Sequence, residues 1–347
     1  MESLSLREIE EEARRRLDPA VYDFFAGGAG DEVTVRANEA AFAQIGLVPR
    51  VLRGSRTREL GVTLLGRRAA LPVIVAPTAF HRLAHPGGEL ATARAAAKAG
   101  VIMVVSMAST VAIEELVETG ADLWFQLYVQ PDLGFTERLV RRAEAVGCAA
   151  LVVSVDSPVF GRRERDLRNG FLDLPPGMAC AHMDGRSIAF RSDLSWDHID
   201  WLRSVTALPI VLKGVVHPQD ARLAVDRGID ALAVSNHGGR QLDTVPATIE
   251  LLPQVADAVV GAVPLLLDGG VRRGTDVLKA LALGADAVAI GRPILWGLAV
   301  DGEDGIARVL DMLRTEFDLA LALCGCRSPR DVSPDLIWRK PCQRCSF

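Results

Sequence analysis

Eight short apolar runs, separated by segments with helical periodicity, dominate residues 72–290 of this chain. They are typical of buried β-strands, because each is short, rich in aliphatic side chains and bounded by polar residues or glycine. Between them, apolar residues recur at three- and four-residue spacing, and several of these helical segments end at a glycine. The runs are Pro72–Ala76, Ile102–Val105, Leu123–Leu127, Ala150–Val155, Pro209–Leu212, Ala231–Val234, Pro264–Leu267 and Ala287–Ile290.

This alternation predicts an α/β fold, a (β/α)8 TIM barrel with a fully buried parallel sheet. A doubly wound open sheet is the alternative, since a single sequence does not reveal strand order. We expect one domain over residues 1–347, with the barrel at about 71–325, N-terminal helices within 1–30 and a tail at 331–347. Residues 60–70 should form a hairpin at the bottom of the barrel. Residues 164–195 lack periodicity and would form a long, mobile loop after the fourth strand.

Composition excludes several other classes of protein. The chain has a net charge of −5 and no basic tract of the kind that binds nucleic acid. Its apolar runs are too short to span a membrane and its N-terminus does not resemble a secretory signal, so we expect a cytoplasmic protein without nucleic-acid or membrane partners. Cys324, Cys326, Cys342 and Cys345 could hold zinc, but spacing alone is weak evidence and we expect reduced thiols and no metal.

Compact polar, charged or glycine residues follow all eight predicted strands. In a barrel these positions meet at the carboxyl face, where active sites lie. A structural role alone would not account for such residues at every strand end. They are Pro77, Thr78 and Ala79; Ser106; Gln126 and Tyr128; Ser154 and Asp156; Lys213; Ser235, His237 and Arg240; Asp268, Gly270 and Arg272; Gly291 and Arg292.

The segment Ser235–Asp243 carries the clearest chemical signal. His237 can accept a proton near neutral pH, and Arg240 can hold a carboxylate through two parallel hydrogen bonds. A base beside a carboxylate-binding group is what the oxidation of a 2-hydroxy acid at its α-carbon requires. The alternative is a surface loop with an incidental histidine and arginine, and the pattern at the other strand ends argues against it.

The ends of the last two strands predict a phosphate site. Gly270 and Gly291 expose backbone N–H groups, while Arg272 and Arg292 add positive charge where barrels usually hold phosphates. Tight turns would explain the glycines but not the two arginines. Lys213 would suit an anionic heteroaromatic ring. Together these residues imply a phosphate-bearing redox cofactor rather than a metal.

The chain resembles the FMN-dependent 2-hydroxy acid oxidase and dehydrogenase family, which includes glycolate oxidases, lactate oxidases and mandelate dehydrogenases. The resemblance runs from about Tyr22 to Arg330 and implies FMN, a small-molecule 2-hydroxy acid and O2 as ligands, and a homotetramer. A set of motifs of this kind is far more specific than one glycine-rich loop. The motifs are Ala76–Ala79, Phe125–Tyr128, Asp156–Pro158, Gly161–Glu164, Ser235–Asp243 and Asp268–Gly274.

The resemblance also implies roles for individual residues. His237 would take the substrate hydroxyl proton, Asp156 would hold the resulting imidazolium, and Tyr128 would bond the substrate oxygen. Arg163 and Arg240 would bind the substrate carboxylate. FMN would contact Ala76, Pro77, Thr78, Ala79, Ser106, Gln126, Ser154, Lys213, Ser235, Asp268, Gly270, Arg272, Gly291 and Arg292.

Two positions depart from the family members that act on small acids. Those members carry Tyr-Asp-Tyr-Tyr where this chain has Tyr22–Phe25, so Phe24 lacks a hydroxyl that helps to hold the carboxylate. They also carry a tryptophan where this chain has Ala108, an exchange that opens apolar volume. Both changes favour an aromatic substrate side chain, as in the members that oxidise 4-hydroxymandelate in glycopeptide-antibiotic biosynthesis.

The resemblance therefore implies oxidation of (S)-4-hydroxymandelate or (S)-mandelate to the benzoylformate, with O2 as acceptor and H2O2 as product. An aliphatic 2-hydroxy acid oxidase acting on glycolate or lactate, a soluble mandelate dehydrogenase with another acceptor, and a barrel that only binds flavin are the alternatives. The loop after Arg163 is shorter than in the family, and residues 172–195 lack the apolar anchor of membrane-bound mandelate dehydrogenases. Whether the α-hydrogen leaves as a proton or as a hydride stays open.

Overall fold

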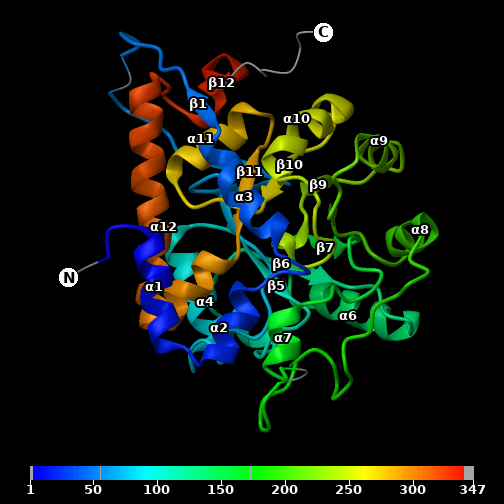
Figure 1. Ribbon diagram of the computed structural model, residues 1–347. Helices are drawn as coiled ribbons and strands as arrows, with labels where there is room; N and C mark the ends of the chain where they lie inside the picture. Colours follow the sequence, from blue (N-terminus) through cyan, green and yellow to red (C-terminus); the bar gives the residue numbers. More distant parts are fainter. Residues whose placement is uncertain (1–2, 55, 172–173, 340–347) are drawn as a thin grey trace.

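A closed barrel of eight parallel strands forms the centre of the molecule (Figure 1). The computed structural model describes residues 3–54, 56–171 and 174–339. Each strand pairs with its sequence neighbours and the last with the first, which confirms the predicted TIM barrel and excludes the open sheet. The strands are β4 (Val73–Val75), β5 (Met103–Ser106), β6 (Leu123–Leu127), β7 (Leu151–Ser154), β8 (Ile210–Lys213), β9 (Ala231–Val234), β10 (Leu265–Asp268) and β11 (Ala287–Ile290).

Helices follow the strands and surround the barrel (Figure 1). The last of them is broken at Asp301 and Gly302, whose backbone is not helical, and it packs against α4, α11 and the N-terminal helix α1 (Leu6–Arg16). The helices are α4 (Gly88–Ala99), α5 (Ile113–Val117), α6 (Leu133–Ala145), α7 (Glu164–Arg168), α8 (Trp196–Val205), α9 (Pro218–Asp226), α10 (Thr248–Val259), α11 (Gly274–Ala282) and α12 (Arg292–Cys324).

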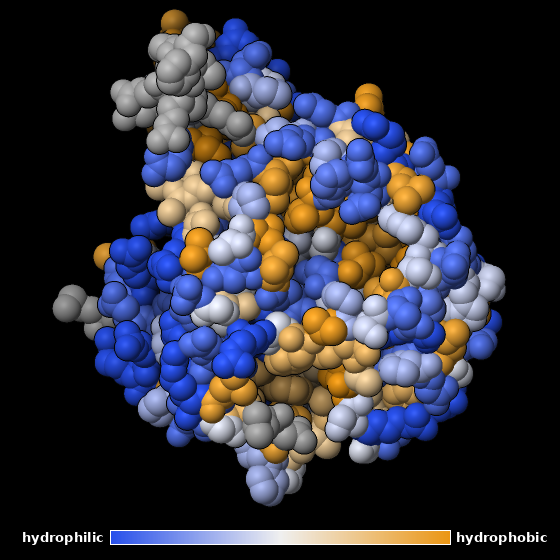
Figure 2. All heavy atoms as spheres, turned by 45° about the vertical axis from the view of Figure 1, so that its right-hand side comes forward, coloured by the Kyte–Doolittle hydropathy of each residue, from blue (hydrophilic) through white to orange (hydrophobic). Residues whose placement is uncertain are grey.

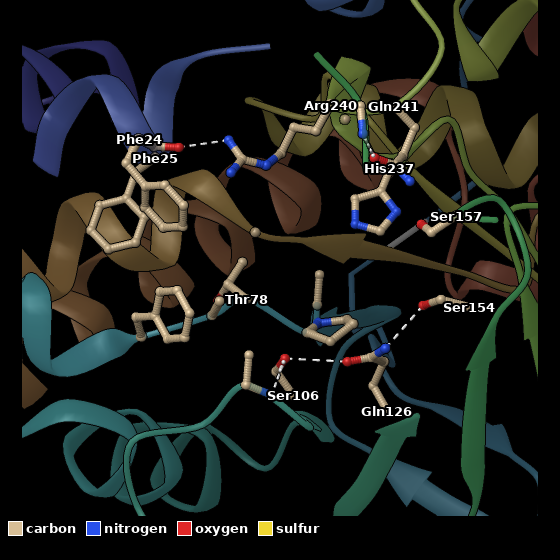
Figure 3. Close-up of a pocket in the computed structure, with 18 of the residues that line it drawn as sticks. Phe24, Phe25, Thr78, Ser106, Gln126, Ser154, Ser157, His237, Arg240 and Gln241 are labelled. Carbon is tan, nitrogen blue, oxygen red and sulfur yellow. Dashed lines mark hydrogen bonds between the residues drawn. The ribbon is translucent and has the colours of Figure 1, made fainter. Parts of the chain in front are cut away.

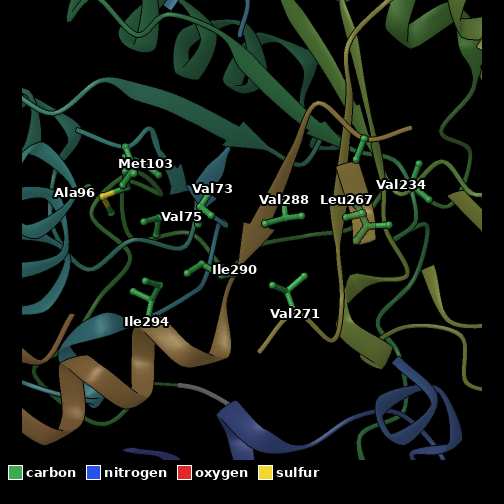
Figure 4. Close-up of a cluster of buried hydrophobic side chains, with 14 of the residues drawn as sticks. Val73, Val75, Ala96, Met103, Val234, Leu267, Val271, Val288, Ile290 and Ile294 are labelled. Carbon is green, nitrogen blue, oxygen red and sulfur yellow. The ribbon is translucent and has the colours of Figure 1, made fainter. Parts of the chain in front are cut away.

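Alternate side chains of each barrel strand point outward to the helices and inward to the barrel axis, as the two-residue repeat of a strand requires. Outward-facing residues such as Val75, Leu267 and Val288 pack in one cluster with the helices (Figure 4). Inward-facing residues such as Trp124 and Leu266 fill a second cluster inside the barrel. Burial of this apolar surface stabilises the fold by about 25 cal/mol per Å².

The next inward position toward the carboxyl end of most strands is polar. Trp124 is followed two residues later by Gln126, and Leu266 by Asp268. The same step leads to Ser106, Ser154, Lys213 and Ser235. The polar residues therefore form the top layer of the barrel interior, directly above an apolar core.

The N-terminal extension reaches further than the predicted range of residues 1–30. It contains α1 (Leu6–Arg16), α2 (Pro19–Ala26) and α3 (Val33–Ala43). The N-cap residue of the third helix, Glu32, makes no side-chain capping hydrogen bond, and the helix buries Thr34 and Asn38, so neither a local cap nor an apolar stripe marks it in the sequence. It packs against α10 and the turn after β9, and Asn38 and Asn236 exchange side-chain hydrogen bonds of 2.9 and 2.8 Å. The extension is thus part of the carboxyl face.

The predicted hairpin is present at the other end of the barrel. β2 (Val62–Leu64) and β3 (Arg67–Ala69) pair antiparallel, and Leu64 and Ala69 belong to the interior cluster. The hairpin therefore closes the bottom of the barrel.

The first part of the predicted tail at 331–347 contains secondary structure. After the short helices η3 (Pro329–Asp331) and η4 (Pro334–Leu336), β12 (Ile337–Arg339) pairs antiparallel with β1 (Ile45–Leu47). Cys324 and Cys326 are free thiols, while Cys342 and Cys345 lie outside the described residues. Within the described ranges, no cluster of three metal-ligating side chains occurs. Among all the residues that the structure describes, no helix combines the length and apolar character needed to cross a membrane.

Candidate active site

A pocket of about 880 Å³ opens at the carboxyl ends of the barrel strands. This volume lies near the upper end of the range for ligand sites, which suits a large ligand together with a small one. Its opening is visible as a recess with a hydrophobic rim near the loop after α7 (Figure 2). The predicted site residues that line it are Phe24, Ala76, Pro77, Thr78, Ala79, Ser106, Ala108, Gln126, Tyr128, Ser154, Arg163, Lys213, His237, Arg240, Asp268, Gly270, Arg272, Gly291 and Arg292.

Two predicted residues, Asp156 and Ser235, act from behind the pocket wall. The Asp156 carboxylate lies 3.0 and 3.1 Å from Nδ1 of His237. Ser235 Oγ accepts hydrogen bonds from Nζ of Lys213 at 2.9 Å and from the backbone N–H of His237 at 3.1 Å. Both residues therefore orient groups that do line the pocket.

His237 is held as a proton acceptor that faces the pocket. It opens the short helix η2 (His237–Gly239) directly after β9. A carboxylate accepts a proton and does not donate one, so the pairing with Asp156 assigns the ring proton to Nδ1. Nε2 is then free to accept, and it lies 3.3 Å from the hydroxyl of Tyr128. Burial raises the pKa of Tyr128, so its hydroxyl stays a donor.

The backbone around His237 is unusual and close-packed. His237 has a φ of 58°, a left-handed conformation that costs a non-glycine residue about 1–3 kcal/mol and recurs at functional sites. Gly214 lies so close to the partner carboxylate that a Cβ there would be 2.5 Å from Cβ of Asp156. Only glycine at this position lets Asp156 approach the imidazole.

We expect the acid limb of kcat/KM to have its midpoint below pH 6.5. Burial lowers the pKa of His237 from its usual 6.5, and Asp156 offsets only part of this effect. The neutral, proton-accepting form therefore persists below pH 6.5, and activity is lost as the pH falls through the lowered pKa. A pH profile of kcat/KM in the holoenzyme measures this midpoint, and a value clearly above 6.5 would contradict the assignment of His237 as the base.

Lys213 and Asp268 form a buried ion pair at the floor of the pocket. Nζ of Lys213 contacts Oδ2 of Asp268 at 2.9 Å. Burial opposes the charge on Lys213, but Asp268 and Asp156 outweigh it and raise the pKa of the amine. Oδ1 of Asp268 is buried and has no hydrogen-bond partner among the described residues, so it can accept a hydrogen bond from a ligand hydroxyl.

The side-chain amide of Gln126, on β6, links the strands on either side, β5 and β7. Oε1 of Gln126 accepts from Ser106 Oγ at 3.2 Å, and its Nε2 donates to Ser154 Oγ at 3.1 Å (Figure 3). In Figure 3 these three residues lie along one side of the pocket, with His237 and Arg240 across from them. The floor thus presents a row of fixed donors and acceptors suited to the edge of a polar ring.

Three guanidinium groups share the pocket with little opposite charge around them. Arg240 donates to the backbone oxygens of Phe24 and Gly27 at 2.6 and 3.0 Å. Burial and the repulsion of Arg163 lower the pKa of Arg240 to about 9. Burial and the repulsion of Arg240 likewise lower the pKa of Arg292 to about 9. Nη1 of Arg163 is 3.9 Å from Asp166. Buried cations of this kind favour an anionic ligand, because it offsets their desolvation.

The predicted phosphate end of the pocket has narrow backbone clearances. A Cβ on Gly270 would overlap the backbone oxygen of Asn38, and one on Gly291 would lie 3.2 Å from Cγ2 of Thr78. Nε of Arg272 is buried without a hydrogen-bond partner among the described residues, although its Nη2 pairs with Glu39 at 2.6 Å. Arg292 donates to the backbone oxygens of Phe25, Gly27 and Gly238. The glycine turns and the two guanidinium groups fit a phosphate, and the row of polar groups beside them fits the rest of a flavin nucleotide.

Sequence reasoning missed much of the apolar wall of the pocket. Phe80 lies directly after the Pro77–Ala79 motif, which is the one local signal that could have revealed it. Phe171 belongs to the loop after β7, whose irregular sequence gives no such signal. Phe24 contacts both rings, with centroid distances of 5.7 Å to Phe80 and 4.7 Å to Phe171. Further lining residues from the same loop are Leu174, Met178, Cys180, Ile188 and Phe190.

Comparisons with known proteins agree with this geometry. The FMN-dependent dehydrogenase family matches residues 13–339. Glycolate oxidase 3 of Arabidopsis thaliana is 46% identical, with 96% of this chain and 95% of that protein aligned. L-lactate oxidase of a Nostoc strain is 45% identical, with 96% and 98% aligned. The crystal structure of mandelate oxidase with (S)-4-hydroxymandelic acid is 43% identical and superposes with a TM-score of 0.91, covering 94% of this chain and 97% of that one.

These matches span nearly the whole chain and include enzymes named for three different substrates. The pocket contains a histidine whose Nε2 can accept a proton, guanidinium groups that can hold an anion, and a site that fits a flavin nucleotide. The chain therefore belongs to the FMN-dependent 2-hydroxy acid oxidase and dehydrogenase family, and FMN is its cofactor.

Proposed function

We propose that this protein oxidises (S)-4-hydroxymandelate or (S)-mandelate to the corresponding benzoylformate, with O2 as acceptor and H2O2 as product. The observation that carries this choice is the small side chain of Ala108 beside an apolar pocket wall that contains Phe24. The relatives do not decide the substrate, because they are named for glycolate, lactate and mandelate alike.

Ala108 lines the pocket, whereas its neighbour Met107 does not. Met107, the neighbouring large side chain, is fully buried in the outer cluster between strands and helices. Phe24 replaces a hydroxyl-bearing residue of the small-acid enzymes and places an aromatic ring in the wall instead. An aryl substituent on the substrate would bury apolar surface here, which a methyl group or a hydrogen could not do to the same extent.

In the reaction, Nε2 of His237 accepts the proton of the substrate hydroxyl. Asp156 stabilises the imidazolium that forms, and the hydroxyl of Tyr128 donates a hydrogen bond to the substrate oxygen. Arg163 and Arg240 bind and orient the carboxylate. FMN supplies the two-electron oxidation that turns the α-carbon from an alcohol into a carbonyl.

The residues proposed to hold FMN come from all parts of the barrel rim. Gly270, Arg272, Gly291 and Arg292 would bind the phosphate, and Asp268 would accept a hydrogen bond from a ribityl hydroxyl. The positive charge of Lys213 would stabilise negative charge on the reduced ring. The other proposed contacts are Ala76, Pro77, Thr78, Ala79, Ser106, Gln126, Ser154 and Ser235.

The variant Ala108→Trp should suppress oxidation of (S)-mandelate much more than oxidation of glycolate or (S)-lactate. An indole placed in this space would overlap the aryl substituent, and overpacking of this kind costs about 1–3 kcal/mol, or roughly 5- to 150-fold in kcat/KM. Steady-state kinetics with the three acids in both proteins measures the effect. Parallel losses on all three would show that the preference does not arise at position 108.

An aliphatic 2-hydroxy acid oxidase is the second candidate, supported by the names of the glycolate and lactate oxidases among the relatives. A wild-type kcat/KM for glycolate or (S)-lactate above that for both mandelates would establish it. A homotetramer and a role in antibiotic biosynthesis are predictions from the family resemblance, and a cytoplasmic location is a prediction from the composition and the N-terminal sequence. Light scattering of the purified protein tests the first of these.

A further inference from the structure

Phe80 has a strained backbone at the edge of the active site. Its φ of 61° and ψ of 47° place a large aromatic residue in the left-handed region. Such conformations persist only where the surroundings enforce them, and they concentrate at ligand-binding positions. Phe80 precedes the short helix η1 (His81–Leu83) and lines the pocket.

A buried hydrogen-bond cluster enforces this conformation from behind. Oε1 of Glu89 accepts from the backbone N–H groups of His81 at 3.1 Å and Thr110 at 2.9 Å. The His81 ring lies between the hydroxyls of Thr78 and Thr92, at 2.6 and 2.8 Å. Glu89 and His81 are both almost fully buried. The residues on both sides of Phe80 are therefore fixed.

The same cluster sets Phe80 beside Ala108. Glu89 joins the loop of Phe80 to Thr110, which lies two residues after Ala108. The backbone N–H of Phe80 also donates directly to the oxygen of Ala108 at 3.2 Å. Ala108, the position where the small-acid members of the family carry a tryptophan, is thus held against Phe80.

Phe80 continues into an aromatic wall that begins at a carboxylate-binding group. Its ring stacks on Phe24 with an interplanar angle of 22°, and Phe24 also contacts Phe171. The guanidinium of Arg240 lies 5.1 Å from the centre of the Phe24 ring. A substrate bound to Arg240 through its carboxylate would therefore have this wall within reach of its side chain.

We propose that Phe80 is a specificity-determining residue that contacts the aryl side chain of the substrate, while Glu89 and His81 are positioning residues that hold it there. The proposal rests on the proposed function and deepens it. Aromatic rings gain more from packing on one another than their buried area alone provides. A methyl substituent is too small to make the same contact, so Phe80 discriminates between the two classes of acid.

The test compares Phe80→Leu, which removes the ring, with Phe80→Tyr, which keeps it. In each FMN-loaded protein, kcat/KM is measured for (S)-mandelate and (S)-lactate. The Kd values of benzoylformate and pyruvate are measured from the shift in flavin absorbance. We expect Phe80→Leu to lower kcat/KM for mandelate about tenfold and to raise the Kd of benzoylformate by a similar factor. The kcat/KM for lactate and the Kd of pyruvate should change by less than about twofold. Phe80→Tyr should retain the wild-type preference for the aromatic compound in both kcat/KM and Kd.

Equal losses on both acids and both products in Phe80→Leu would overturn the proposal, because they would show a structural role only, and unchanged mandelate kinetics would overturn it too. If Phe80→Leu does not retain FMN, Phe80→Met provides the same comparison, because methionine also lacks the ring and has nearly the same volume as leucine. A wild-type preference for lactate would count against the proposed function, whereas the ratio of benzoylformate to pyruvate binding still decides whether Phe80 contacts an aryl group.

Discussion

His237→Asn is expected to keep FMN and to lose about two to four orders of magnitude in turnover. Asparagine removes the proton acceptor but tolerates a left-handed backbone better than most residues do, so the φ of 58° at this position is preserved. The loss should then reflect chemistry rather than a rearranged loop. Flavin absorbance measures retention of FMN, and anaerobic stopped-flow reduction by (S)-mandelate measures the chemical step.

His217→Asn is the matched control for this variant. His217 is exposed and caps the N-terminus of α9 by accepting from the backbone N–H of Gln219 at 3.2 Å, a role that asparagine performs well. The control should reduce its flavin at the wild-type rate. Near-normal reduction in His237→Asn itself would show that the base is another group.

Arg240→Lys should lower kcat/KM for carboxylate substrates by roughly 10- to 150-fold, since a charged hydrogen bond contributes about 1.5–3 kcal/mol. Lysine keeps the positive charge but loses the planar pair of donors that matches a carboxylate. It can also replace only part of the contacts that Nη1 makes with the backbone oxygens of Phe24 and Gly27. The kinetics of (S)-mandelate and of its amide, compared in both proteins, measure the effect.

The amide makes this experiment specific for the carboxylate. We expect wild-type protein to prefer mandelate strongly over mandelamide and Arg240→Lys to lose much of that preference. Arg222→Lys, on the exposed face of α9, is the control and should behave as wild type. Equal rates for acid and amide in the wild-type protein would refute the idea that Arg240 and Arg163 anchor a carboxylate.

The barrel could be predicted from the sequence because its determinants are local. Each strand is a short apolar run such as Ala231–Val234, and the polar residue that follows lies at a strand end whose position in a barrel is fixed. The step from Trp124 to Gln126 on one face of β6 illustrates this. Knowing that the fold is a barrel is enough to bring such residues to one rim, so His237, Arg240 and Lys213 could be placed there without coordinates.

What could not be predicted depends on contacts between distant segments. The pairing of β1 with β12 joins the two ends of the chain, and α3 is defined by packing rather than by an apolar stripe. The partners of Arg292 are backbone oxygens of Phe25, Gly27 and Gly238, which no sequence pattern marks. Phe80 depends on a left-handed backbone that is enforced by the buried Glu89.

On the proposed function, this protein should oxidise an aromatic 2-hydroxy acid, with bound FMN as the electron acceptor. The decisive experiment is an anaerobic titration of the FMN-loaded protein with (S)-4-hydroxymandelate. Its two readouts are the absorbance of the oxidised flavin and the amount of 2-oxo acid formed. We predict complete bleaching with stoichiometric product, faster than with (S)-lactate or glycolate, and return of the absorbance when O2 is admitted. A flavin that stays oxidised with 4-hydroxymandelate and mandelate, or that bleaches faster with lactate or glycolate, would contradict the proposed function.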